Sequence, residues 1–214
     1  MDEETKSIED GYKEIASDYK TTVKSDDLDH RYIEKFLSLF QPGQKILDIG
    51  SGTGNIAHEI KLQHQLDVTA VDISKEMVDL AREAYPDLRV IQMDIRELKF
   101  EPESFNGIFA NYSLIHVPEK DITKTLTRIN ELLVPGGYLY LSLQEPVGPM
   151  DKDGYYSVVY RPEVKLFINL FSEQEMRDHL VQNSFEVTYV DRRPHQQGME
   201  FPFNKLFIIA RKVS

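Results

Sequence analysis

The stretch KILDIGSGTGNIAHEI, residues 45–60, decides the fold of this chain. A short apolar run ends at Asp48 and leads into a turn in which glycines alternate with small polar residues. The glycines are Gly50, Gly52 and Gly54. Glycines let a ligand approach the main chain closely, and the start of a helix offers free N–H groups. The stretch therefore predicts a buried strand that enters a helix through a ligand-binding turn.

The composition limits the classes of protein that this chain can represent. It has 214 residues, of which 41% are hydrophobic, so it is long enough to bury the core of one α/β domain. No apolar run reaches the ~18 residues that a membrane span needs. The chain has no cysteine, which excludes thiolate chemistry and favours a cytoplasmic location. Its net charge of −11 argues against nucleic acid as a partner.

Strands and helices are expected to alternate downstream of the glycine turn. Strands are predicted at 45–50, 68–73, 89–95, 105–113 and 138–144, and helices at 53–63, 74–85 and 121–134. This alternation predicts a doubly wound, mostly parallel sheet with helices on both faces.

The two ends of the chain follow other patterns. Residues up to about 41 have helical spacing and predict an N-terminal helical cap. A capping box, Ser172 with Glu175, opens a helix over 172–183. Two apolar stretches without an intervening helix predict an antiparallel edge pair after it. The aromatic-rich segment 145–171 is too long for an ordinary connection and is expected to form a lid or substrate wall.

The glycine turn is compatible with three classes of ligand site, and its spacing separates them. A P-loop needs Lys and then Ser or Thr after the last glycine, but Asn55 and Ile56 stand there. A dinucleotide turn needs Gly or Ala at the sixth position, which is Asn55. The third class is the D-x-G-x-G-x-G turn, which the stretch matches from Asp48 to Gly54. Two further acids, Asp72 and Asp94, end the second and third predicted strands, where carboxylates can accept hydrogen bonds from a nucleoside.

With the segments NYSLIHVPEK (111–120) and ELLVPGGYLYLS (131–142), these motifs resemble the class I S-adenosylmethionine-dependent methyltransferases of small-molecule type. The resemblance implies an α/β, Rossmann-like fold with seven strands and an antiparallel C-terminal strand. It also implies a single methyltransferase domain over 1–214, with residues 1–41 as the cap and 145–171 as a substrate-side insertion. The cofactor, S-adenosyl-L-methionine, is expected at the carboxyl ends of the strands.

The resemblance assigns roles to individual residues. Asp48 and the glycine turn would surround the methionine end, and Asp72 would bind the ribose. Asn111 would offer its backbone carbonyl to the cofactor ammonium. The full set of expected cofactor-binding residues is Tyr19, Asp48, Gly50, Ser51, Gly52, Gly54, Asp72, Ile73, Met77, Asp94, Ile95 and Asn111. No metal is expected.

Ile73 and Met77 are expected to pack on the adenine, while Asp94 and Ile95 hold its edge. Tyr19, in a segment similar to the Y-x-x-I-A-x-x-Y opening common in the family, is expected to cover the methionine. Two departures from the family pattern occur. Ile115 stands where a first histidine is frequent, and Asn183-Ser184 replaces the usual glycine, with Asn183 expected to tolerate the left-handed helix cap.

The expected function is methyl transfer to a small-molecule acceptor at oxygen, nitrogen or carbon, by in-line displacement without a membrane or nucleic-acid partner. His116 follows the fourth strand and titrates near neutrality, so it is the candidate general base. A structural hydrogen bond from His116 to the backbone is an equally good interpretation. Two other functions stay open: a non-catalytic S-adenosylmethionine-binding regulatory protein, and a Rossmann-type oxidoreductase with a nucleotide cofactor.

Overall fold

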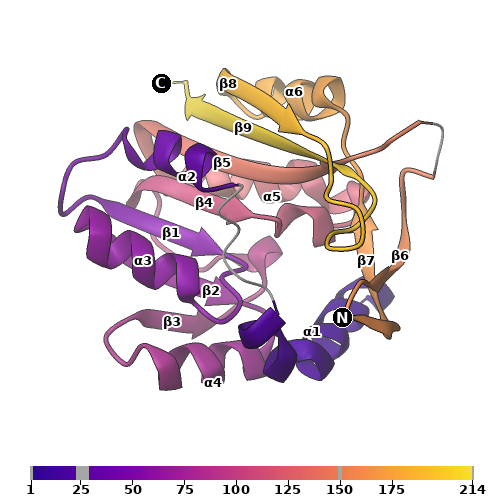
Figure 1. Ribbon diagram of the computed structural model, residues 1–214. Coiled ribbons are helices and arrows are strands. Elements are labelled where there is room, and N and C mark those ends of the chain that lie inside the picture. The colour runs from indigo at the N-terminus through magenta and orange to yellow at the C-terminus, as the bar shows by residue number, and fades with distance from the viewer. Residues whose placement is uncertain (1, 23–28, 149–150, 214) are drawn as a thin grey trace.

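The computed structural model describes residues 2–22, 29–148 and 151–213, without the side chains of Ser17 and of residues 19–22 (Figure 1). The helices are α1 Glu3–Thr22, α2 His30–Leu37, α3 Asn55–His64, α4 Lys75–Ala84, α5 Glu119–Leu132 and α6 Glu173–Gln182, with the short helices η1 Ile95–Glu97 and η2 Leu114–His116. The strands are β1 Lys45–Ile49, β2 Asp67–Asp72, β3 Arg89–Gln92, β4 Phe105–Asn111, β5 Leu133–Glu145, β6 Asp153–Val158, β7 Arg161–Asn169, β8 Phe185–Arg193 and β9 Asn204–Lys212.

Seven of the strands form one sheet in the order β3-β2-β1-β4-β5-β9-β8. The pairs from β3 to β5 are parallel, whereas β9 runs antiparallel to both β5 and β8. The order reverses between β1 and β4, where open α/β sheets bind ligands. The predicted doubly wound sheet with an antiparallel last strand is confirmed.

Helices cover both faces of the sheet because its strands are apolar on both sides. In β9, Leu206, Ile208 and Ala210 belong to the core that also holds α5 and α6. The alternate residues, Phe207 and Ile209, belong to the core under α2, α3 and α4. Such continuous apolar strands are typical of sheets that are buried on both faces.

Local signals place several of these elements. Ser74 caps α4, accepting a hydrogen bond from Met77 N, and Ser172 with Glu175 forms the predicted capping box of α6. The left-handed residue after α6 is Ser184, with φ 61°, and not the expected Asn183, whose φ is −101°. The expectation for Asn183 was wrong because Asn183 is still the C-cap, whose backbone N–H bonds to the carbonyl of His179, and the left-handed position falls one residue later.

Two segments differ from the sequence prediction. The strand β5 begins at Leu133, which pairs with Phe105, so it starts inside the helix predicted over 121–134 and well before the strand predicted over 138–144. Segment 145–171 contains an antiparallel hairpin, β6–β7, which is not part of the main sheet. No helix among the described residues combines the length and the apolarity that crossing a bilayer requires.

The hairpin and α1 form a third layer beside the carboxyl ends of the parallel strands (Figure 1). A Cβ added to Gly11 of α1 would lie 2.5 Å from Leu166 of β7, so the helix and the strand are in close contact. Ile8 and Ile15 of α1 share a buried cluster with Leu166 and with Met77 of α4. This layer places the predicted N-terminal cap and the predicted insertion on the same side of the sheet.

Candidate active site

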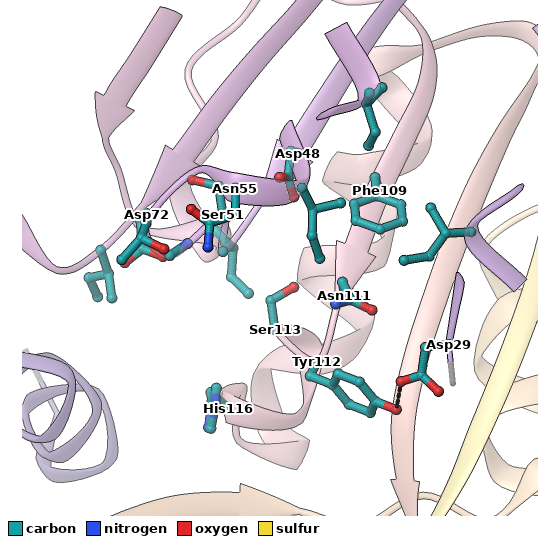
Figure 2. A pocket seen from close by; sticks show the side chains of 18 of the residues that line it. Asp29, Asp48, Ser51, Asn55, Asp72, Phe109, Asn111, Tyr112, Ser113 and His116 are labelled. Carbon is teal, nitrogen blue, oxygen red and sulfur yellow. Dashed lines mark hydrogen bonds between the residues drawn. The ribbon is translucent and has the colours of Figure 1, made fainter. Parts of the chain in front are cut away.

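A pocket of about 350 Å³ lies at the carboxyl ends of β1, β2 and β4 (Figure 2). The walls come from the glycine turn, α1, α2, α3 and the segment after β4. In Figure 2, Asp72 and Ser51 lie on one side of the pocket, Tyr112 and Asp29 lie on the other, and His116 lies below.

The glycine turn has the backbone that only glycine adopts readily. Gly50 has φ 75°, and a Cβ at this position would lie 2.3 Å from the Cβ of Ser113. Gly54 is the N-cap of α3 in the left-handed conformation, and an added Cβ there would meet Ala81 and Leu88. The turn therefore brings the main chain against the segment after β4 with no side chain between them.

Asp72 joins the glycine turn to the start of α4. Its carboxylate accepts hydrogen bonds from Gly52 N (2.8 Å) and Ser74 N (2.9 Å). Burial raises the pKa of Asp72 to about 6, even though the backbone N–H groups act in the opposite direction. The carboxylate thus has a structural role as well as a place in the pocket wall.

Asp48 is 2% exposed, and no group in the described part of the chain donates a hydrogen bond to its carboxylate. Burial, together with the charge of Asp72, raises the pKa of Asp48 to about 8. The hydroxyls of Ser51 and Ser113 are buried in the same wall without a hydrogen-bond partner. Buried polar groups are rarely left unpaired, so this wall fits a polar, cationic ligand.

Asp94 lies at the end of the pocket nearest η1. Arg96 binds both of its carboxylate oxygens, with the shortest contact at 2.7 Å from Nη2 to Oδ2. The Arg96 guanidinium also contacts Asp2 at 2.7 Å and Asp121 at 3.3 Å. Arg96 itself lines the pocket.

His116 has hydrogen bonds at both ring nitrogens. Its Nδ1 lies 2.7 Å from the carbonyl of Phe167 in β7, and its Nε2 lies 2.8 Å from the hydroxyl of Tyr12 in α1. Because a carbonyl only accepts, Nδ1 carries the proton, and in a neutral ring Nε2 then accepts from Tyr12. Burial lowers the pKa of His116 to about 4, so the ring is neutral at pH 7.

The opposite wall is organised by Tyr112, which has φ 52°. Its hydroxyl donates to Asp29 (2.8 Å), whose other oxygen accepts from Nε of Arg193 (2.6 Å). Arg193 also binds both carboxylate oxygens of Glu200. Burial raises the pKa of Tyr112, as does the charge of Asp29, so the phenol stays a hydrogen-bond donor. These contacts tie α2 and the β8–β9 connection to the pocket.

Most residues expected at the site do line the pocket: Asp48, Gly50, Ser51, Gly52, Asp72, Ile73, Asp94, Ile95, Asn111 and His116. Gly54 and Met77 do not, because Gly54 faces α4 and Met77 is buried between α4 and α1. Tyr19 is in α1, but its side chain falls outside the described part. Asn111 uses its side-chain oxygen to accept from Ser142.

The lining residues that sequence reasoning missed include Tyr12, Asp29, Arg96 and Ser113. Tyr12 had the spacing of an ordinary helix face. Arg96 follows Asp94 by two residues, and this short separation was the one local signal that Arg96 could bind the Asp94 carboxylate in the site. Asp29 is adjacent to Tyr112, and Ser113 is adjacent to the glycine turn, only in the folded chain.

The chain is similar in sequence to known methyltransferases. Residues 46–137 match a family described as "Methyltransferase domain". An O-methyltransferase from Pyrenophora dematioidea is 30% identical over 72% of this chain and 59% of its own length. A demethylmenaquinone methyltransferase from Chlorobaculum tepidum is 26% identical over 66% of this chain and 58% of its own length. The match spans less than two thirds of these curated relatives.

The fold recurs in solved structures. A Burkholderia thailandensis 1,6-didemethyltoxoflavin-N1-methyltransferase, crystallised with 1,6-didemethyltoxoflavin and S-adenosylhomocysteine, superposes with a TM-score of 0.77. It is 22% identical, and the match covers 98% of this chain and 88% of that chain. The family match includes the glycine turn together with Asp72, Asp94 and Asn111. Residues 46–137 of the chain therefore match the methyltransferase-domain family, and the chain as a whole has the fold of solved S-adenosylmethionine-dependent methyltransferases.

Proposed function

We propose that this protein is an S-adenosylmethionine-dependent methyltransferase that acts on a small-molecule acceptor. The observation that carries the proposal is the buried, unpaired carboxylate of Asp48 in a pocket that also holds the glycine turn and Asp72. A cationic amino group or sulfonium is the kind of ligand that such a carboxylate stabilises. The relatives and the bound S-adenosylhomocysteine of the Burkholderia structure support the same cofactor.

Each expected residue has a distinct task in this proposal. Asp72 accepts hydrogen bonds from the ribose hydroxyls with lone pairs that its two backbone donors leave free. Ile73 and Ile95 contact the base, and Asp94 accepts from its amino edge. The Asn111 carbonyl and Asp48 hold the ammonium group. When bound, S-adenosylmethionine supplies a methyl group on a positively charged sulfur. The surrounding walls align the acceptor with the C–S bond and exclude water.

His116 and Tyr12 together are the candidate route for a proton. Nε2 of His116 accepts from Tyr12, so a proton leaving the acceptor reaches the ring through the phenol oxygen while the phenol proton moves to Nε2. With a pKa near 4, His116 takes a proton readily only from a strongly acidic group. An acceptor oxygen or nitrogen that gains positive charge during methyl transfer is such a group.

We further propose that the whole chain acts as one methyltransferase domain in the cytoplasm. The β6–β7 hairpin is its substrate-side insertion, because β7 supports His116 through the Phe167 carbonyl. The lack of cysteine is consistent with a reducing compartment.

Calorimetric titration with S-adenosylmethionine, S-adenosylhomocysteine and NAD tests the cofactor. We expect micromolar binding of the first two and none of the third. The isosteric variant Asp72→Asn should weaken binding by about 1–3 kcal/mol, the scale of charge-assisted hydrogen bonds. Binding of NAD alone would show that the chain is instead a nucleotide-cofactor oxidoreductase.

One observation favours a second function, that of a non-catalytic S-adenosylmethionine-binding regulator. Both ring nitrogens of His116 are already bonded within the protein. A screen of phenols, amines and carbon acids, read as formation of S-adenosylhomocysteine, separates the two. Tight cofactor binding with no turnover across the panel would favour the regulator.

A further inference from the structure

Arg96 links the pocket to the beginning of the chain. It is a single side chain, 15% exposed, that contacts three carboxylates from three separate segments. Asp94 is in the pocket wall, Asp121 is in the first turn of α5, and Asp2 directly precedes α1. An arginine fork shared among several acids fixes geometry more firmly than a single exposed ion pair.

Asp2 is held from both sides. Its Oδ1 accepts from the backbone N of Thr5 (2.9 Å) and from the Thr5 hydroxyl, which makes Asp2 the cap of α1. Its Oδ2 accepts from Nη1 of Arg96. The Thr5 hydroxyl, and after it Arg96, hold the pKa of Asp2 well below its usual range, so the carboxylate is charged at neutral pH. The first turn of α1 is therefore fixed relative to η1.

The helix that Arg96 holds in this way forms part of the pocket. Thr5, Ile8 and Tyr12 of α1 all line it. Arg96 thus contacts the residue expected to recognise the base and also the helix that covers the same end of the pocket. The contact with Asp121 lacks this property, because Asp121 is on α5 and does not line the pocket.

We propose that Arg96 is a positioning residue, which orients Asp94 toward the base and at the same time fixes α1 over the cofactor through Asp2. This inference rests on the proposed function, since it assigns the affinity for the adenosyl group partly to a contact between Arg96 and the N-terminal helix. Asp2 has no direct contact with the cofactor in this arrangement, yet it contributes to cofactor affinity.

The test is a double-mutant cycle in the full chain, read as the dissociation constant of S-adenosylhomocysteine by calorimetry. Asp2→Asn keeps an oxygen that can cap α1 but removes the charge that Arg96 binds. Asp121→Asn is the matched control, because it removes a charge from the same Nη1 without touching α1. Arg96→Met removes the link altogether.

We expect Asp2→Asn to weaken binding by about fivefold and Asp121→Asn by less than about twofold. The effects differ because only the ion pair between Asp2 and Arg96 couples α1 to the pocket. Arg96→Met should weaken binding by about tenfold or more. Asp2→Asn should have no further effect in the Arg96→Met background. The fragment 5′-methylthioadenosine, which keeps the base and ribose, should lose affinity by the same factors.

Equal effects of Asp2→Asn and Asp121→Asn would overturn the proposal, as would an Asp2→Asn effect that persists in the Arg96→Met background. Insensitivity of 5′-methylthioadenosine would also overturn it, since the network would then not act at the base end. The melting temperature of each variant without ligand shows whether it is still folded at the temperature of the titration. Only the affinities of folded variants enter the cycle, so a loss of affinity then reports on positioning and not on loss of folding. If the wild-type protein bound neither compound, the proposed function would fail instead.

Discussion

Gly50 shows how directly the pocket depends on single backbone positions. It combines a positive φ with a separation of only 2.3 Å between its would-be Cβ and the Cβ of Ser113. The unpaired hydroxyls of Ser113 and Ser51 and the buried carboxyl group of Asp48 lie in the wall around it. A change at Gly50 therefore alters the turn and the segment after β4 together.

Gly50→Ala should lower the free energy of unfolding by about 2–4 kcal/mol, the sum of backbone strain and overpacking. Gly43→Ala is the matched control: Gly43 also has a positive φ, of 83°, but nothing lies within 4 Å of its would-be Cβ. Gly43→Ala should lower the free energy of unfolding by about 1 kcal/mol, from backbone strain alone. Urea denaturation measures both, and equal losses would mean that the contact with Ser113 has no cost.

The affinity for S-adenosylhomocysteine should rise with pH between 5 and 8. Burial raises the pKa of Asp72 to about 6 and that of Asp48 to about 8. Only the ionised form of Asp72 accepts fully from the ribose hydroxyls, and only the ionised form of Asp48 attracts the ligand's ammonium group. The slope should reach about tenfold per pH unit per group below each pKa. Calorimetry across this range should find that Asp48→Asn flattens the rise between pH 6 and 8. An unchanged slope in that variant would remove Asp48 from the ligand's contacts.

At the residue scale, the sequence predicts the site residues that stand beside a recognisable strand end, and it misses contacts between residues that come together only in the folded chain. Asp48, Asp72 and Asp94 could be identified because each lies at or just after the end of a strand that is visible in the sequence. The contact of Tyr12 with His116 and that of Asp29 with Tyr112 could not, since each joins residues more than eighty positions apart. The place of Met77 was not foreseeable either, because α1 covers it only in the folded chain.

At the scale of elements, the β6–β7 hairpin supports α1 and the pocket at once. Its strand β7 contacts Gly11 of α1 through Leu166, and one residue later it offers the Phe167 carbonyl to His116. The sequence of 145–171 predicted an insertion but no hairpin. Mixed aromatic and turn residues mask the alternation of β6, where the exposed positions face outward from a two-stranded sheet.

Leu166→Ala should lower the free energy of unfolding by about 2–5 kcal/mol, because it opens a cavity between β7 and α1. Ser157→Ala, at an exposed position of β6 in the same hairpin, should change it by less than about 0.5 kcal/mol. Differential scanning calorimetry compares the two variants. A similar melting temperature for both would mean that the hairpin does not hold α1.

At the scale of the whole molecule, the pocket acids make folding and binding respond oppositely to pH. Asp48 has a folded pKa near 8 against an ordinary value of 3.8, so the folded chain holds its proton while the unfolded chain releases it. Its contribution to stability is present below pH 4 and is lost as pH rises toward 8. His116, whose pKa is lowered, contributes above pH 6.5 and loses that contribution as pH falls toward 4.

The variant Asp48→Asn should therefore gain stability relative to the wild type as pH rises from 5 to 8, by about 1 kcal/mol per pH unit. It should bind S-adenosylhomocysteine more weakly toward pH 8, because the wild-type Asp48 is increasingly ionised there and attracts the ammonium group. Such an opposition between stability and binding is common at functional sites. Urea denaturation at pH 5 and pH 8 measures the gain. A stability difference that does not depend on pH would contradict the buried, protonated state of Asp48.

The contacts of α1 also have a consequence for the order in which the protein takes shape during synthesis. The ribosome makes α1 before the residues that hold it, since Arg96 follows Asp2 by 94 residues and His116 follows Tyr12 by 104 residues. The strand β7, which packs along α1, emerges later still. The helix α1 can therefore settle only after the parallel strands and β7 exist, so the pocket is completed long after its α1 wall has been synthesised.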